Sequence, residues 1–133
     1  NNFQGYYKKS KKKLSKEIIS AIERGLKYTA KDYAEAIDFM KRSYESYREV
    51  FEDYHGVLTP ATTGVADKGL KSTGSPEFCT IWTYMGLPSI SLPLLVGANN
   101  LPLGVQLIGD KLDDLRFLGV ANWLEKKSKK YAK

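Results

Sequence analysis

Apolar residues recur at helical spacing in several stretches of the chain and alternate with other residues in shorter ones. The first helical stretch covers residues 14–24, and Gly25 follows where a helix C-cap favours glycine. Thr29 then precedes a much longer stretch that reaches Tyr54, and Asp32 completes a capping-box-like pattern with Thr29. The pattern therefore predicts a short helix followed by a long one.

One apolar stripe runs along the long helix in alternating steps of four and three residues. Its members are Tyr33, Ile37, Met40, Tyr44, Tyr47, Phe51 and Tyr54. We interpret the stripe as the face that packs on the chain's own core, and a seam for a partner protein is the alternative.

The remaining elements are shorter, and proline and glycine mark their ends. They are a strand at 57–60, a loop at 61–75, a helix at 77–85, strands at 89–95 and 103–109, and a helix from 114 to about 127. Ser75 is the predicted N-cap of the middle helix, with Pro76 in its first turn. The two later strands are predicted to form a hairpin, in which Pro93 indicates an edge strand or a bulge.

The last helix carries apolar residues around much of its circumference. We place Leu115, Leu118, Ala121, Asn122 and Leu124 on its packed side, with Phe117, Val120 and Trp123 widening that face.

Together these elements predict an α/β fold. It has a small mixed sheet of about three strands, including a C-terminal hairpin, packed with about four helices. The apolar helix faces are wider than three strands can cover, so we expect this sheet to be part of a larger one. We divide the chain into a basic tail at 1–13, a single domain at 14–127 and a second basic tail at 128–133.

The net charge of +6 comes from the two ends of the chain. Eleven lysines cluster there, at positions 8, 9, 11, 12, 13, 16, 126, 127, 129, 130 and 133. The body between them holds ten Lys and Arg residues against fifteen Asp and Glu residues, a net charge of −5. We interpret the lysine runs as solvated helix ends and expect no nucleic-acid partner, while contact with nucleic acid or acidic lipid is the alternative.

Composition excludes several classes of protein. One Cys cannot form an internal disulfide, and one Cys with one His cannot build a His/Cys zinc site, so we expect no metal and no cofactor. We expect no membrane span, because no apolar run is long enough to cross a bilayer. The lysine-rich start is not a secretory signal, so we expect a cytoplasmic protein. Because the chain begins at Asn1, we also expect it to be a fragment.

No catalytic constellation emerges from the residue pattern. The glycine loop at 64–72 lacks a lysine directly after its second glycine, so it is not a phosphate-binding loop. His55 has no serine in a nucleophile-elbow motif to activate. Cys79 lies within a predicted helix, where a small buried residue is the commoner role than a nucleophile. The pair Asp113 and Asp114 fits helix capping.

The order and spacing of several motifs resemble the C-terminal region of the amidase signature family. Each motif is weak alone, but two are specific together through their order and spacing: G-L-P-S-I-S-L-P at 86–93 and L-P-L-G-V-Q-L-I-G at 101–109. Weaker ones are L-T-P at 58–60, G-L-K-S-T-G-S-P-E-F at 69–78 and I-W-T at 81–83. The resemblance covers roughly residues 14–127.

The resemblance implies hydrolysis of a carboxamide C–N bond by a Ser-Ser-Lys triad with an oxyanion hole. The chain has no Gly-Gly-Ser-Ser-Gly run and no lysine that matches the catalytic one, so we assign no catalytic residue. We expect the C-terminal portion of a general amidase that is inactive alone. The alternatives are a free-standing binding or assembly module and a subunit of an amidotransferase complex.

The resemblance also places five residues near the rim of a substrate pocket. They are Thr62, Thr73, Gly74, Phe78 and Trp82. Phe78 and Trp82 are four residues apart on one helix face, and a role in the core is the alternative for both. Ser75 stands where the family often has an aspartate. We expect an amide substrate to bind only together with the missing N-terminal part, and we expect self-association through an exposed sheet edge.

Overall fold

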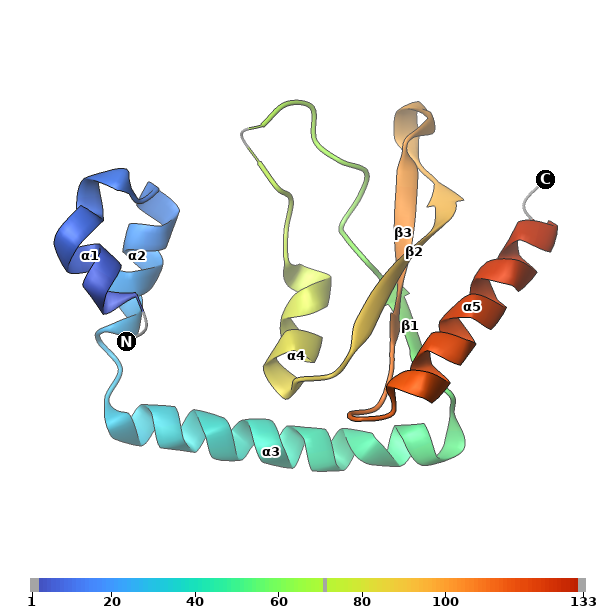
Figure 1. Ribbon diagram of the computed structural model, residues 1–133, viewed down its shortest axis with the longest axis horizontal. Coiled ribbons are helices and arrows are strands. Elements are labelled where there is room, and N and C mark those ends of the chain that lie inside the picture. The colour runs from blue at the N-terminus through green and yellow to red at the C-terminus, as the bar shows by residue number, and fades with distance from the viewer. Residues whose placement is uncertain (1–2, 71, 132–133) are drawn as a thin grey trace. The chain divides into compact units, whose positions relative to one another are not determined.

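A computed structural model describes residues 3–70 and 72–131 (Figure 1). Its elements, in chain order, are α1 (Gln4–Ser10), η1 (Lys11–Lys13), α2 (Lys16–Gly25), α3 (Ala30–Asp53), β1 (Val57–Pro60), α4 (Glu77–Met85), β2 (Ser89–Val96), η2 (Ala98–Asn100), β3 (Pro102–Ile108) and α5 (Asp114–Tyr131). The α/β class expected from the sequence is confirmed, with five α-helices where about four were expected.

The chain divides into two compact units, Asn1–Phe39 and Met40–Lys133. The first contains α1, η1, α2 and the start of α3. Residues 4–13, which we expected to form a basic tail, fold as α1 and η1 in this unit. The second basic segment is likewise helical as far as Tyr131, the end of α5.

Side chains cap the first turns of α2 and α3, and the cap of α3 is the one that the sequence predicts. The hydroxyl of Ser15 accepts a hydrogen bond from the amide of Ile18 at the start of α2. At α3, the Thr29 hydroxyl accepts from the Asp32 amide at 3.2 Å, and the Asp32 carboxylate accepts from the Thr29 amide at 2.7 Å. This reciprocal pair is the predicted capping box.

The C-cap of α2 differs from the prediction. Gly25 is the last helical residue, and Leu26 caps the helix in the right-handed conformation, with φ −70°. The left-handed glycine cap occurs instead at Gly86, which has φ 69° and ends α4. There the amides of Gly86 and Leu87 donate to the last carbonyls of the helix.

The second unit is built on a three-stranded sheet in the order β1-β3-β2. Both pairings are antiparallel, which corrects the expectation of a mixed sheet for the described strands. The predicted hairpin of β2 and β3 is confirmed. Their register shifts between Leu92 and Leu95, so Pro93 lies at an irregularity on an edge strand, as its sequence position indicates.

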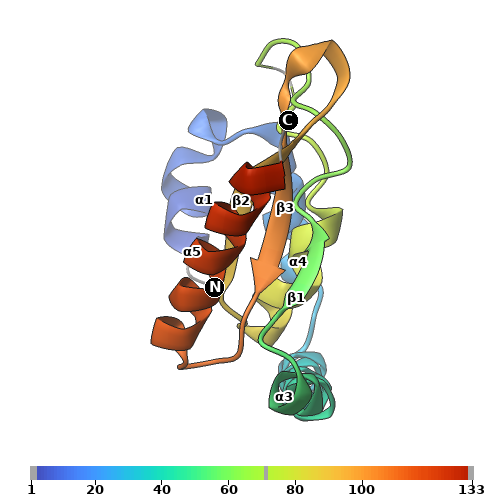
Figure 2. The same ribbon diagram turned by 90° about the vertical axis from the view of Figure 1, so that its right-hand side faces the viewer.

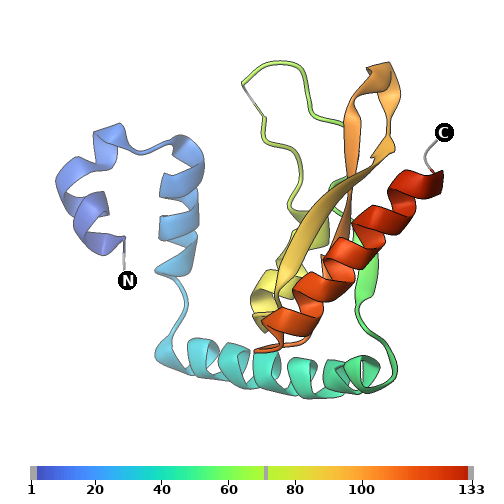
Figure 3. The ribbon, with the colours of Figure 1, turned by 45° about the vertical axis from the view of Figure 1, so that its right-hand side comes forward.

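Helices cover both faces of this sheet (Figure 2). On one face α5 runs beside β2 (Figure 3), and the buried residues there are Leu107, Phe117 and Ala121. On the other face the buried cluster is Phe51, Trp82, Met85, Leu87 and Ile108. Tyr44 and Tyr47 pack against that second cluster, so this part of the apolar stripe on α3 meets the core as predicted.

The ends of the predicted stripe do not pack in this way, since the side chains of Tyr33 and Tyr54 are exposed. The packed side of α5 is also narrower than predicted. Phe117 and Ala121 are buried, whereas Leu115 is 90% exposed and Leu118 and Trp123 are more than half exposed. Phe117 determines which side of α5 faces the sheet. Its ring lies so close to Gly109 that a Cβ built on Gly109 would be 2.5 Å from the ring.

Within the described residues, no helix combines the length and the apolar character needed to cross a membrane.

Candidate functional site

The predicted pocket rim lies where the long loop between β1 and α4 meets the sheet. The loop starts against the central strand, because the amide of Ala61 donates to the carbonyl of Gly104 at 3.1 Å. Gly104 has no room for a side chain: a Cβ there would lie 2.5 Å from the Ser91 hydroxyl and 3.1 Å from the Ala61 Cβ. Glycine at 104 therefore lets the loop begin directly over the sheet.

A second contact holds the middle of the loop. Val65 lies against Gly97, in the turn that joins β2 to β3, and a Cβ at Gly97 would clash with the Val65 methyl group. The loop is thus packed against the hairpin.

The two ends of the loop approach each other at Thr62 and Gly74. A Cβ built on Gly74 would lie 3.9 Å from the Thr62 hydroxyl oxygen. Gly74 has φ 80°, a conformation that favours glycine, and its amide donates to the Ser72 hydroxyl. Thr73, which lies between Ser72 and Gly74, is exposed. Three of the five predicted rim residues therefore gather at one point.

Ser75 and Pro76 lead from this point into α4. The helix is capped by Pro76, rather than by Ser75 as predicted, and the Ser75 hydroxyl accepts from the amide of Glu77 at 3.3 Å. The side chain that replaces the family's frequent aspartate is thus engaged with the start of the helix.

Phe78 and Trp82 have different surroundings on α4. Phe78 is half-buried, one residue from a cysteine that contacts the loop. Trp82 is 7% exposed and belongs to the buried cluster, where its ring meets that of Tyr47 edge to face at 5.4 Å. The contacts of Trp82 are those of a core residue, the alternative that the sequence left open, and its place at a rim stays a prediction.

A polar group that the sequence analysis did not single out lies beneath the loop. Gln106 on β3 is buried, and its side-chain amide donates to the sulfur of Cys79 at 3.8 Å. The Cys79 thiol donates in turn to the carbonyl of Ala61 at 3.6 Å, and the Thr59 hydroxyl lies 3.4 Å from the Gln106 carbonyl oxygen. One chain of hydrogen bonds thus connects β3, α4 and the start of the loop.

The alternation along β3 could have revealed Gln106. It shares a strand face with Gly104 and Ile108, so a carboxamide follows a glycine on the face that packs against α4. Buried polar side chains are hydrogen-bonded in the great majority of proteins, and Gln106 follows that rule.

A second polar cluster joins α3 to the segment after β3. The Tyr44 hydroxyl donates to the Asp110 carboxylate at 2.8 Å, and the Lys111 amide donates to the same oxygen at 2.7 Å. Burial, and then the hydrogen bond to Asp110, raises the pKa of Tyr44 to about 12. This cluster fixes the approach to α5.

The other candidate groups do not form a reactive pair. Cys79 is hydrogen-bonded to Ala61 and Gln106, and in the described part of the chain no hydrogen bond joins it to His55. In those same residues, no group of three His, Cys, Asp or Glu side chains could hold a metal ion.

Two surface hollows among the described residues lie away from the predicted rim. One, of about 370 Å³, belongs to the first unit and is lined mainly by Phe3, Ile18, Ala21, Ile22 and Leu26. The other, of about 620 Å³, is lined by Thr83, Gly86, Leu87, Pro88, Lys111, Leu112 and Asp114. None of the five predicted rim residues lines either of these two hollows.

The chain belongs to the amidase family. The family model described as Amidase matches residues 1–118. The match begins at residue 1, so it includes the lysine-rich segment that lies before the motifs from which the resemblance was identified.

Curated relatives carry a more specific name, that of a glutamyl-tRNA(Gln) amidotransferase subunit. The relative from Alkaliphilus metalliredigens is 33% identical over 100 residues, which are 70% of this chain and 20% of that protein. The mitochondrial relative from Anopheles gambiae is 29% identical over 105 residues, 72% of this chain and 21% of that protein. The chain thus spans about a fifth of the length of these relatives.

A solved structure has the same fold. The crystal structure of an amidase matches with a TM-score of 0.76 and 22% identity, over 94% of this chain and 31% of that chain. Nearly all of this chain therefore corresponds to less than a third of a larger fold.

Proposed function

We propose that this chain forms the C-terminal part of an amidase that hydrolyses a carboxamide C–N bond. The observation that carries the proposal is the match of residues 1–118 to the amidase family. The motifs at 86–93 and 101–109, on which the family resemblance rests, fold as β2 and β3 with the turn before β2. These two strands support the loop at the predicted rim.

In this proposal the chain contributes a wall of the pocket, and sequence outside these residues supplies the nucleophile. Thr62, Thr73 and Gly74 form the edge of the wall, and Phe78 offers an apolar surface beside them. Trp82 supports that surface from the core. A rim fixed by the sheet in this way orients an amide before attack, which lowers the entropic cost of the reaction.

The chain by itself is proposed to be inactive. The resemblance implies a triad of two serines and a lysine. The 133 residues contain no Gly-Gly-Ser-Ser-Gly run and no lysine that matches the catalytic one. Purified chain should release no ammonia from simple amides or from glutamine. Sustained turnover by the chain alone would overturn this part of the proposal.

A second candidate is a subunit of an amidotransferase complex. The names of the curated relatives favour it, since both relatives are named as subunits of such an enzyme. The family resemblance in the sequence led us to expect a general amidase rather than such a subunit.

The test begins with the coding DNA upstream of Asn1. We expect it to continue in frame into a lysine and then a glycine- and serine-rich core; a start codon directly upstream would contradict this. The longer product, purified gently, separates the two candidates. A general amidase releases ammonia from simple amides as a single chain, whereas an amidotransferase subunit copurifies with partners and depends on them for activity with glutamine.

A further inference from the structure

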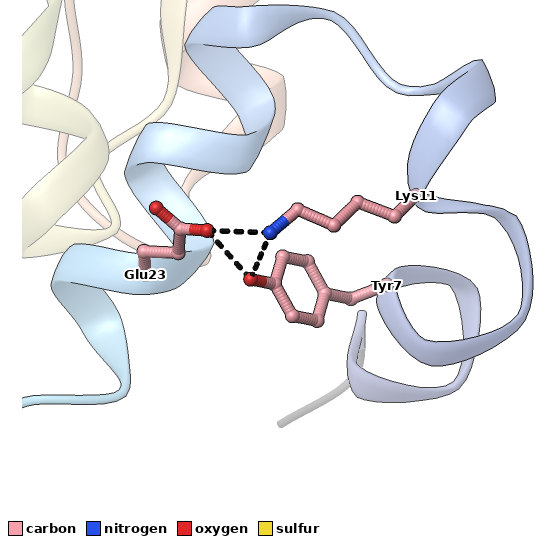
Figure 4. Close-up of polar contacts among 3 residues, drawn as sticks. All are labelled: Tyr7, Lys11 and Glu23. Atoms are coloured by element: carbon pink, nitrogen blue, oxygen red, sulfur yellow. Dashed lines mark hydrogen bonds and ion pairs between the residues drawn. The ribbon is translucent and has the colours of Figure 1, made fainter.

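The lysine-rich segment of the first unit is held in place by a three-residue network (Figure 4). The Tyr7 hydroxyl donates to the Glu23 carboxylate at 2.6 Å, and the Lys11 ammonium donates to that oxygen at 2.8 Å and to the Tyr7 hydroxyl at 2.7 Å. These contacts join α1 and η1 to α2. The segment that we expected to be a tail therefore folds against α2, with Lys11 at the contact.

The part of this unit that contains α1, η1 and α2 is strongly basic. Residues 4–25 hold seven basic side chains and two acidic ones, a net charge of +5 out of +6 for the whole chain. Lys11 is paired with Glu23. The other five lysines, at positions 8, 9, 12, 13 and 16, are exposed, and none forms an ion pair with another described residue.

An apolar groove lies within the same unit. Its volume is about 370 Å³, and the apolar residues that line it come from the start of α1 and from one face of α2. Phe3, Ile18 and Leu26 remain roughly half exposed or more, at 61%, 46% and 52%. Gln4 also lines the groove, and Lys8 is one helical turn further along α1 on the same face.

We propose that this surface, made of the groove and the lysines around it, binds an anionic membrane surface. Protein segments bind at the interface of a bilayer when an apolar surface is buried at the acyl boundary and lysines are attracted to anionic headgroups. The groove residues would enter the boundary between headgroups and acyl chains. Lys8 and its neighbours contact the lipid phosphates.

Charge and chemistry favour a bilayer over other anionic partners. Single-stranded nucleic acid is bound by aromatic stacking platforms in a basic groove, whereas this groove is lined mainly by aliphatic side chains. The rings of Phe3 and Tyr6 are exposed, and tyrosine is enriched at membrane interfaces because its ring is apolar and its hydroxyl can stay in water. The proposal concerns the first unit alone and does not depend on the proposed amidase activity.

The test is sedimentation of the full chain with lipid vesicles. Vesicles of neutral phosphatidylcholine are compared with vesicles in which part of the lipid is phosphatidylglycerol, at about 20 mM and about 150 mM salt. We expect binding to the anionic vesicles that weakens as salt rises, and little binding to the neutral ones. Equal binding to both, or no binding to either, overturns the proposal.

Matched variants locate the surface. Each lysine near an anionic membrane contributes about a fivefold increase in affinity, so Lys8→Gln with Lys12→Gln should weaken binding about 25-fold. The control replaces two exposed lysines of α5, Lys126→Gln with Lys127→Gln, and should leave binding within about twofold of the original. Equal losses in the two pairs would show a general charge effect and would contradict the proposal.

The groove is tested by Ile18→Ser, with Leu115→Ser on α5 as its control. Loss of the partly buried isoleucine contacts should weaken vesicle binding roughly fivefold, while the control leaves it unchanged. Circular dichroism of each variant checks that the helices persist. Two results assign the groove to another occupant and overturn the proposal: self-association that Ile18→Ser abolishes, or displacement of the chain from vesicles by an acidic amphipathic peptide. Binding to RNA without binding to vesicles also overturns it.

Discussion

The ammonium group of Lys111 lies over the ring of Tyr44, 3.7 Å from the ring centroid. The hydroxyl of that same ring donates to Asp110, the residue just before Lys111. The consecutive residues Asp110 and Lys111 thus contact the hydroxyl and the ring face of Tyr44, respectively. Since Tyr44 lies on α3 and the pair follows β3, these contacts join the long helix to the sheet within the second unit.

Replacement of Tyr44 by phenylalanine should remove the hydrogen bond and keep the packing. We expect the free energy of unfolding to fall by about 1 kcal/mol, the usual net contribution of one such bond. Urea denaturation at neutral pH measures the change. Tyr54→Phe is the control, because that side chain is exposed, and it should leave stability unchanged.

The same tyrosine predicts a loss of stability in alkali. Its pKa is raised to about 12 in the folded chain, above the value near 10 of an unfolded chain. The stabilising contribution is therefore complete below pH 10 and is lost as the pH rises from about 10 to 12. The difference in stability between the original chain and Tyr44→Phe should shrink across that interval. A difference that stays constant would contradict the assignment.

Two substitutions on α4 should separate a core residue from a rim residue. Trp82→Ala should cost about 3–5 kcal/mol of stability, because it empties a buried site against Tyr47. Phe78→Ala should cost clearly less, since that side chain is only half-buried. In an active, longer amidase, Phe78→Ala should raise KM. If Phe78→Ala destabilises as much as Trp82→Ala, both residues belong to the core.

We expect position 106 to tolerate loss of the polar group of Gln106 better than a gain of charge. In Gln106→Leu, the Cys79 thiol keeps the Ala61 carbonyl as acceptor and the Thr59 hydroxyl keeps that of Pro60, so stability should change by no more than about 1 kcal/mol. Gln106→Glu buries a carboxylate without a cationic partner and should be strongly destabilising at pH 7.

The pH dependence distinguishes these two effects. Burial raises the pKa of a carboxyl group, so the penalty in Gln106→Glu should be smallest near pH 4 and grow toward pH 7. Thermal denaturation at the two pH values measures it, with Gln106→Leu as the uncharged control. A penalty independent of pH would mean that the cost does not come from burying a charge, and would contradict this prediction.

The packing of the loop on the hairpin can be tested at Gly97. In Gly97→Ala the new methyl group meets Val65, and we expect a loss of about 1–3 kcal/mol. Val65→Ala in the same chain should restore part of the lost stability, because it removes the Val65 methyl group that the new side chain at position 97 would contact. Without such a rescue in the double variant, the cost would belong to the turn itself.

Local signals in the sequence predicted those parts of the fold that depend on local chemistry. The capping box of Thr29 and Asp32 needs only residues three apart, and it formed as predicted. Pro93 lacks an amide hydrogen whatever surrounds it, so its position on an irregular edge strand followed from the sequence. The motifs at 86–93 and 101–109 identified the family in the same way.

The packed face of α5 could not be predicted from periodicity, because apolar residues surround that helix. The choice of Phe117 over Leu115 depends on the space above Gly109, which exists only once β3 is in place. The packing of the N-terminal lysine segment could not be predicted either, because it depends on a contact between Lys11 and Glu23, which are twelve residues apart. Gln106 and its partners come from three separate elements, so no local pattern could assemble them.

Both outer strands of the sheet contain a proline. Pro60 is the last residue of β1, and Pro93 lies at the irregularity of β2, and neither residue has an amide hydrogen to donate to a neighbouring strand. A strand that pairs with either edge of this sheet, from a second copy or from a longer chain, therefore gains no amide donor at these two positions. The two prolines thus limit the pairing available for the self-association through a sheet edge that the sequence predicts.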